Sequence, residues 1–206
     1  MNILAIGAHP DDIELGCLGT LLKHVSEGHR VATLTLSDGQ GGNAPSHIRR
    51  SEARSLGLTV PYTKIYHGDI LASNLNFMRQ ETIDFIERII EIEKPQIVYC
   101  HSEHDRHQHH KIVAMSSAIA TRFVDQVFSF ELPSTLNGFN PNYFVDIVLQ
   151  CNTKIELMKI FRSQKEKPYM QEEAIRSRAL DWAVKANMYP RSKAVEAFHV
   201  ERFSKW

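Results

Sequence analysis

The chain has 206 residues, 43% of them apolar, and its 24 basic residues balance its 24 acidic ones. A chain of this length is expected to form one domain, residues 1–206, whose core needs no disulfide or structural metal. The zero formal charge argues against a broad electrostatic surface for nucleic acid or anionic membrane. One feature of the composition stands out: 11 residues are histidine, and five of them lie between His101 and His110.

We expect the protein to carry neither a secretion signal nor a membrane anchor. No stretch approaches the roughly 18 consecutive apolar residues of a membrane-spanning helix. The N-terminal segment MNILAIGAHPDD lacks a basic leader and a small-residue cleavage site, so we expect a cytoplasmic protein without a membrane span. The cysteines Cys17, Cys100 and Cys151 are odd in number and match no disulfide or zinc spacing, which predicts reduced and buried thiols.

Short apolar runs and amphipathic stretches alternate along the first half of the chain. In chain order they predict a strand at 2–8, a helix at 15–25, a strand at 30–36, a helix at 48–56, a strand at 64–67, a helix across the stripe Ile83, Ile86, Ile89 and Ile90, and a strand at 96–100. The second half alternates less regularly and predicts strands at 127–130 and 144–149 and helices at 153–162 and 172–186. This order is typical of an α/β domain with a Rossmann-like, mostly parallel sheet that is covered by helices on both faces.

Polar segments follow two of the predicted strands directly. The sequence His9-Pro10-Asp11-Asp12 comes after the first strand, and HSEHDRHQHH, from His101 to His110, comes after the strand at 96–100. In an open α/β sheet, ligands bind beyond the carboxyl ends of the strands, near the point where the strand order reverses. If these two strands are neighbours, the two segments face each other across one crevice.

Imidazole and carboxylate groups in this arrangement predict a catalytic zinc site, which takes three protein ligands and leaves one position open. His9 and Asp12 are three residues apart across a turn and can converge on one ion. We expect His110 to be the third ligand, because the helical pattern begins there and directs its ring back into the crevice. Asp11 is then free to act as a base beside a water molecule whose pKa zinc lowers to about 7. A protonated His107 would stabilise an oxyanion as it forms.

Each of these residues also has an ordinary structural explanation. A histidine after a strand is commonly a hydrogen-bonded polar group or a helix cap, and an aspartate such as Asp12 is favoured in a first helical turn by the helix dipole. The combination is harder to explain in this way, because both polar segments lie at the edge of the sheet where ligands bind. The five clustered histidines are too many for one site, and we expect His101 and His104 to lie outside the ligand set.

The segment HPDDIELG, from His9 to Gly16, closely resembles the signature of the PIG-L/LmbE family of zinc-dependent N-acetylglucosaminyl deacetylases. The later DRHQHH resembles that family's second motif, although the family commonly has aspartate where this chain has His109. FELPS, PNYFVDI, RSQ and VEAF also resemble family landmarks, so the likeness covers nearly the full chain. It implies a hydrolase that removes the acetyl group from an N-acetylated amino sugar conjugate.

The resemblance implies the same roles that the residues themselves suggest. It implies that zinc is held by His9, Asp12 and His110, that Asp11 is the general base, and that His107 stabilises the oxyanion.

Two further assignments rest on the resemblance alone. Arg49, which forms an Arg-x-x-Glu pair with Glu52, is expected to contact the substrate. Asp69, or Asn74 in its place, is expected to supply a sugar-binding side chain. The expected partner is a small-molecule sugar conjugate, and family members are often homo-oligomers.

Two other functions fit parts of the same pattern. A metal-dependent phosphoesterase would use the same crevice, but it normally needs two metals about 4 Å apart and more carboxylate ligands. A non-catalytic sugar- or nucleotide-binding module would not need Asp11 beside a metal, and the first strand-to-helix turn lacks the G-x-G-x-x-G fingerprint of nucleotide binding. We expect the segment 38–47 and the second half of the chain to determine which sugar conjugate is bound.

Overall fold

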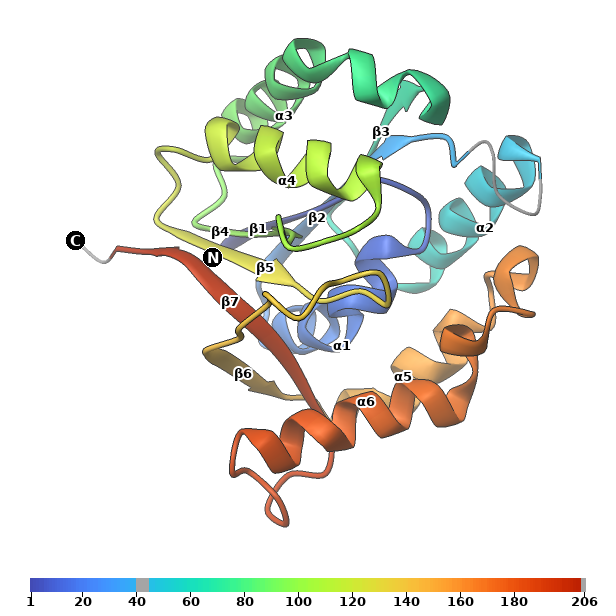
Figure 1. Cartoon of the computed structure of the whole chain (residues 1–206), viewed down its shortest axis with the longest axis vertical. Coiled ribbons are helices and arrows are strands. Elements are labelled where there is room, and N and C mark those ends of the chain that lie inside the picture. Colours follow the sequence, from blue (N-terminus) through green and yellow to red (C-terminus); the bar gives the residue numbers. More distant parts are fainter. Residues whose placement is uncertain (40–44, 205–206) are drawn as a thin grey trace.

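A seven-stranded sheet forms the centre of the structure, a computed structural model that describes residues 1–39 and 45–204 (Figure 1). The strands are β1 (Asn2–Gly7), β2 (Arg30–Ser37), β3 (Lys64–Ile70), β4 (Ile97–His101), β5 (Gln126–Phe130), β6 (Tyr143–Asp146) and β7 (Val195–Phe203). Their order in the sheet is β3-β2-β1-β4-β5-β7-β6. The strands β1 to β5 are parallel, whereas β7 runs antiparallel to both β5 and β6.

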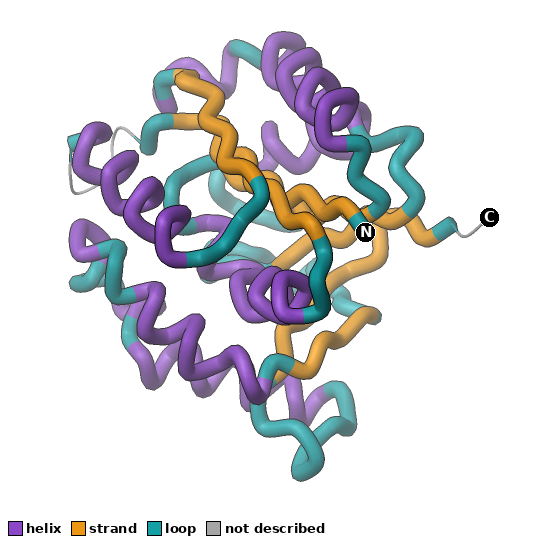
Figure 2. The backbone as a smooth tube through the Cα atoms, turned by 180° about the vertical axis from the view of Figure 1, so that it is seen from behind, coloured by secondary structure: helices purple, strands orange, loops and turns teal. Residues whose placement is uncertain are grey.

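Helices cover both faces of this sheet (Figures 1 and 2). They are α1 (Asp12–Ser26), α2 (Ser46–Thr59), α3 (Arg79–Glu93), α4 (Gln108–Ala120), α5 (Val148–Met158) and α6 (Glu172–Lys185), with short 3-10 turns η1 (Ala72–Phe77), η2 (Arg162–Gln164) and η3 (Pro168–Met170). Along β1, Ile3 and Ala5 belong to the core that includes α1, α2, α5 and α6. Leu4 and Ile6 belong to the core that includes α3 and α4. The continuously apolar first strand is therefore buried on both faces, as a central parallel strand must be.

The fold class predicted from the sequence is confirmed, and the elements up to β5 lie close to their predicted positions. Two predictions in the second half are wrong. The strand predicted at 144–149 ends at Asp146, whose carboxylate accepts the N–H of Val148 at 3.0 Å and so caps the start of α5. The helix predicted at 153–162 accordingly begins and ends earlier, at Val148–Met158. The pattern also does not predict β7, which inserts between β5 and β6.

The position of the functional residues follows from the strand order. Successive strands extend the sheet from β1 to β2 and β3 on one side and from β4 to β5 on the other, so the strand order reverses between β1 and β4. These two strands are hydrogen-bonded neighbours. The segments that follow their carboxyl ends, which carry His9 and His107, consequently lie side by side, as ligand-binding segments do in open α/β sheets.

The three cysteines, Cys17, Cys100 and Cys151, are all buried and free. Burial raises the thiol pKa of Cys17 and Cys100, which keeps both in the unreactive protonated form. Within the described chain, every helix is either too short or too polar to traverse a lipid bilayer.

Candidate active site

A cavity of about 770 Å³ opens at the carboxyl edge of β1 and β4. The turn between β1 and α1 contributes His9, Asp11 and Asp12 to its wall, and the start of α4 contributes the segment 107–110. The structure therefore brings together the two polar segments that are about one hundred residues apart in the sequence. Other parts of the wall come from α2, from the segment 132–134 and from η3.

The carboxylate of Asp12 lies at the centre of a group of three imidazoles. Its Oδ2 atom is 3.1 Å from His9 Nδ1, 3.3 Å from His101 Nε2 and 3.4 Å from His110 Nε2. Burial opposes ionisation, but the charge of His110 and then that of His9 outweigh it, so the pKa of Asp12 lies well below its usual value. One donor atom each of His9, Asp12 and His110 lies within 4.8 Å of the other two, and all three residues are buried. Two nitrogens and one carboxylate at this spacing suit a divalent transition metal.

His110 is held by a second carboxylate on its far side. Its Nδ1 atom is 3.0 Å from Asp105 Oδ2, and Ser134 donates to the same oxygen at 2.9 Å. Burial lowers the pKa of His110, but Asp12 and Asp105 reverse this effect and raise it to about 10. An outer carboxylate that fixes a ligating imidazole is a common feature of metal sites. No role was predicted for Asp105 from the sequence, although the need of His110 for such a partner was a usable signal.

Asp11 occupies a strained position next to this group. It is the N-cap of α1 and has a φ of 101°, in the left-handed region that non-glycine residues rarely adopt. Its Oδ1 atom accepts a 2.7 Å hydrogen bond from Arg49 Nη2. Burial raises the pKa of Asp11 to about 6, against the opposing effect of the Arg49 charge. A carboxylate with this pKa can accept a proton near neutral pH.

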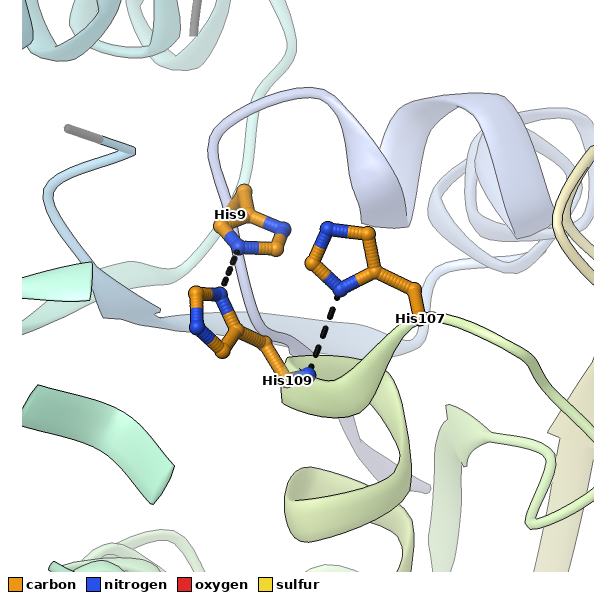
Figure 3. A group of neighbouring side chains, drawn as sticks. All are labelled: His9, His107 and His109. Carbon is orange, nitrogen blue, oxygen red and sulfur yellow. Dashed lines mark hydrogen bonds between the residues drawn. The ribbon is translucent and has the colours of Figure 1, made fainter. Parts of the chain in front are cut away.

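The surroundings of His107 favour a neutral ring, whereas the protonated form was expected from the sequence. Its Nδ1 atom accepts the backbone N–H of His109 at 3.2 Å and so caps α4 (Figure 3). Burial and the nearby charge of His110 lower the pKa of His107 to about 4. Because Nδ1 is an acceptor, the ring proton of the neutral imidazole lies on Nε2. His107 is thus an uncharged N–H donor in the cavity wall.

The first residue expected to contact the substrate is Arg49. Arg49 lines the cavity, but its guanidinium donates to the carbonyls of Gly39 at 2.9 Å and Pro10 at 2.7 Å as well as to Asp11. Its most direct action is therefore to hold the carboxylate of Asp11. Glu52, the other member of the Arg-x-x-Glu pair, accepts from the N–H and hydroxyl of Ser163, at 2.8 and 2.6 Å, and ties α2 to the RSQ segment.

The alternative sugar-binding positions lie near η1. The side chain of Asp69 is outside the part of the structure that is described, as are residues 40–44 of the segment expected to influence specificity. Asn74 is exposed, and among the described residues of η1 it is Ser73 that lines the cavity. Lys167 and Tyr169 also line it, although no pattern in the sequence identified them.

The remaining histidines of the cluster differ in position. His101 is buried against Asp12, and its ring stacks on that of His110 with a centroid separation of 4.3 Å. The side chain of His104 is 51% exposed and faces Glu103. His109 lines the cavity, and its Nδ1 atom is 2.9 Å from His9 Nε2 (Figure 3).

The chain is similar to known proteins over most of its length. The family model described as GlcNAc-PI de-N-acetylase (PIG-L) matches residues 4–121. An uncharacterized deacetylase of Escherichia coli, YaiS, is 32% identical over 151 residues, which cover 71% of this chain and 82% of that protein. Diacetylchitobiose deacetylase of Thermococcus kodakarensis is 27% identical over 188 residues, which cover 79% of this chain and 70% of that protein.

The fold is also that of a solved structure. The conserved protein TT1542 from Thermus thermophilus superposes with a TM-score of 0.84 at 19% sequence identity, covering 100% of this chain and 97% of that one. The family model matches more than half of the chain and includes both polar segments of the cavity. The chain therefore belongs to the PIG-L family of de-N-acetylases.

Proposed function

We propose that this protein hydrolyses the acetyl amide of an N-acetylglucosamine-type conjugate, with zinc held by His9, Asp12 and His110. The observation that carries the proposal is the position of Asp11, a base with a raised pKa, directly beside this three-residue ligand group. Both curated relatives are named as deacetylases, and the one from Thermococcus kodakarensis is named for diacetylchitobiose, an N-acetylated sugar.

The ligand group fits zinc in its chemistry. Two imidazoles and one carboxylate are a common catalytic zinc set, and such a set leaves a position open toward the cavity. When bound, zinc supplies a Lewis acid that polarises the amide carbonyl and lowers the pKa of water. Asp105 on the far side of His110 keeps the proton on His110 Nδ1 and leaves Nε2 free for the ion.

The other residues move or hold protons. Asp11 accepts a proton from the attacking water as the new C–O bond forms, and Arg49 keeps its carboxylate aimed into the cavity. The Nε2–H of His107 donates a hydrogen bond to the carbonyl oxygen as negative charge develops there. Asp11 then returns the proton to the nitrogen as the C–N bond breaks, which yields acetate and the free amine.

The cavity has the size and polarity of a small-molecule site. Ser73, Lys167 and Tyr169 are polar groups in its wall that can bond the hydroxyls of a sugar. Arg49 and Asp69 remain predicted substrate contacts, and assembly into a homo-oligomer also remains a prediction. A two-metal phosphoesterase is less well supported, because such enzymes use several carboxylate ligands. Among the described residues, the candidate metal groups at the cavity contain a single carboxylate, that of Asp12.

The first test of this function is acetate release from a panel of N-acetylglucosamine conjugates. We expect release to stop after treatment with a chelator and to return when zinc is added back. A matched panel of O-acetylated sugars tests whether the cleaved bond is an amide. Activity that survives complete removal of the metal would contradict the proposed role of zinc.

Replacing His107 with asparagine tests the role of its Nε2–H. Asparagine can still cap α4, because its side-chain oxygen accepts from the same backbone N–H, but it has no donor at the position of Nε2. We expect kcat to fall by about 100- to 1,000-fold with little change in KM, since the lost bond forms in the transition state. His104→Gln is the matched control, because it changes an exposed histidine of the same segment and should leave both constants unchanged. A kcat close to that of the unmodified protein in His107→Asn would exclude this role.

A further inference from the structure

His109 has no part in the reaction proposed above, yet it lies in the wall of the same cavity. The ring centroids of His9, His107 and His109 form a nearly equilateral triangle, with separations of 5.0, 5.1 and 5.1 Å (Figure 3). One ring nitrogen of each residue lies within 4.8 Å of the corresponding nitrogens of the other two. Three imidazoles that bind a tetrahedral ion at about 2.0–2.1 Å place their ring centroids about 5 Å apart. The spacing of the three side chains therefore suits three ligands of one ion.

We propose that His9, His107 and His109 form a second metal position, alternative to the one at His9, Asp12 and His110, that binds a divalent transition metal such as Zn²⁺ or Cu²⁺ through three imidazole nitrogens. An all-nitrogen set of this kind suits zinc and copper rather than magnesium or calcium.

The two positions share His9 and exclude each other at that residue. His9 Nδ1 lies 3.1 Å from Asp12 and serves the first position, whereas Nε2 lies 2.9 Å from His109 Nδ1 and serves the second. A neutral imidazole offers one lone pair and one N–H. An ion at Nδ1 leaves the Nε2–H to donate to His109, and an ion at Nε2 leaves the Nδ1–H to donate to Asp12. When His9 binds an ion at one position, its remaining ring N–H donates to a residue of the other position, either His109 or Asp12. A ligating histidine needs a partner of this kind.

His107 provides a structural marker for the second position. Its Nδ1 atom accepts the backbone N–H of His109 and caps α4. Coordination through Nδ1 would use the lone pair that accepts this bond, and coordination through Nε2 would move the ring proton to Nδ1. In either case an ion at the second position breaks the cap. A metal at the first position leaves the cap intact.

An ion at the second position occupies His9 and so excludes an ion from the first position, and coordination through Nε2 of His107 also removes the N–H that this ring donates. The second position is therefore an inactive state of the site, a consequence that rests on the deacetylase reaction proposed above. Metal binding itself does not depend on that reaction, so the two proposals can fail separately.

The test compares metal binding in variants that each remove one position. His110→Gln removes a ligand of the first position and leaves in place both the three imidazoles and Asp12, the partner of His9 Nδ1. His109→Asn removes the second, while its side-chain oxygen can still accept the N–H of His9. All proteins carry His29→Gln, because His24, Glu27 and His29 form a separate group near the end of α1 that can also hold a metal. Binding is measured with Zn²⁺ against a chromophoric chelator and with Cu²⁺ by electron paramagnetic resonance, which counts the coordinating nitrogens.

We expect His110→Gln to bind one ion through three nitrogens, and the double variant His110→Gln/His109→Asn to bind at least about 100-fold more weakly. Zn²⁺ should shift the amide signal of His109 in the nuclear magnetic resonance spectrum of His110→Gln, because the cap is lost. Equal affinities in the single and double variants would overturn the proposal and leave His109 as a hydrogen-bond partner of His9. Asp12→Asn replaces His110→Gln in the same comparison if the latter does not fold, since it removes the carboxylate ligand of the first position and keeps an oxygen that can accept the Nδ1–H of His9.

Discussion

Replacing Asp11 with asparagine is expected to lower kcat by about 100- to 10,000-fold, the usual contribution of a general base. Asparagine keeps an oxygen that can accept from Arg49, and it tolerates the left-handed backbone at this position better than alanine does. It cannot accept a proton from water. Asp11 is also outside the proposed zinc ligands, so the zinc content of the variant should equal that of the unmodified protein.

The pH profile provides a second measurement of the same role. Burial raises the pKa of Asp11 to about 6, and the carboxyl group must be ionised to act as a base. The kcat/KM of the unmodified protein should therefore rise as the pH increases through this region and fall as Asp11 becomes protonated below it. The Asp11→Asn variant should lack this acidic limb. If the variant retained both full zinc content and more than a tenth of the activity, another group would have to be the base.

Replacing Lys154 with methionine is expected to lower the free energy of unfolding by about 3–5 kcal/mol, the usual cost of removing one partner of a buried ion pair. Lys154 on α5 lies 2.7 Å from Glu196 on β7, and both side chains are 6% exposed. Glu196 also accepts the backbone N–H of Gly19 at 2.9 Å and of Thr20 at 2.7 Å. Lys154 in turn donates to the carbonyl of Leu15 at 2.8 Å. The pair thus joins α5 and β7 to the helix that begins at the active site.

The double variant Lys154→Met/Glu196→Met should be less destabilised than Lys154→Met alone. It no longer buries an unpaired carboxylate, and the carbonyl of Leu15 and the N–H of Gly19, four residues apart in α1, can bond each other. Urea unfolding of both variants measures the difference. Lys185→Met removes an exposed pair with Asp181 and should change the free energy of unfolding by less than about 0.5 kcal/mol. A double variant less stable than the single one would show that Glu196 acts mainly as an acceptor for α1 rather than as a counter-ion.

The parts of the fold that could be predicted are those whose pattern is local. The strand β1 is apolar at every buried position, and α3 carries its isoleucines at helical spacing, so both are visible in a short window of sequence. The strand β7 was missed because its partners, β5 and β6, are far away in the sequence and its outer half is exposed. The boundary between β6 and α5 was misplaced because a capping bond from Asp146 decides it.

The candidate site shows the same division. His9, Asp12 and His110 could be selected because each follows or precedes a recognisable element and has the chemistry of a metal ligand. Lys167 and Tyr169 could not be selected, because η3 reaches the cavity through the packing of the C-terminal part of the chain. Asp105 is an intermediate case. A metal-binding histidine needs a hydrogen-bond partner on its second ring nitrogen, but the sequence offers several residues that could be this partner.

By itself, the sequence determined the α/β alternation, the family and the residue types of the candidate metal group, because these depend on periodicity and on short motifs. Only the tertiary structure decided the charge states and partners. The pKa of His107 is lowered because its ring is partly buried near the charge of His110, and the pKa of Asp11 is raised because burial outweighs the opposing charge of Arg49. His109 faces the second nitrogen of His9 because β1 and β4 are neighbours in the sheet. Burial and hydrogen bonding between distant segments set these properties, and neither can be deduced from the spacing of residues along the chain.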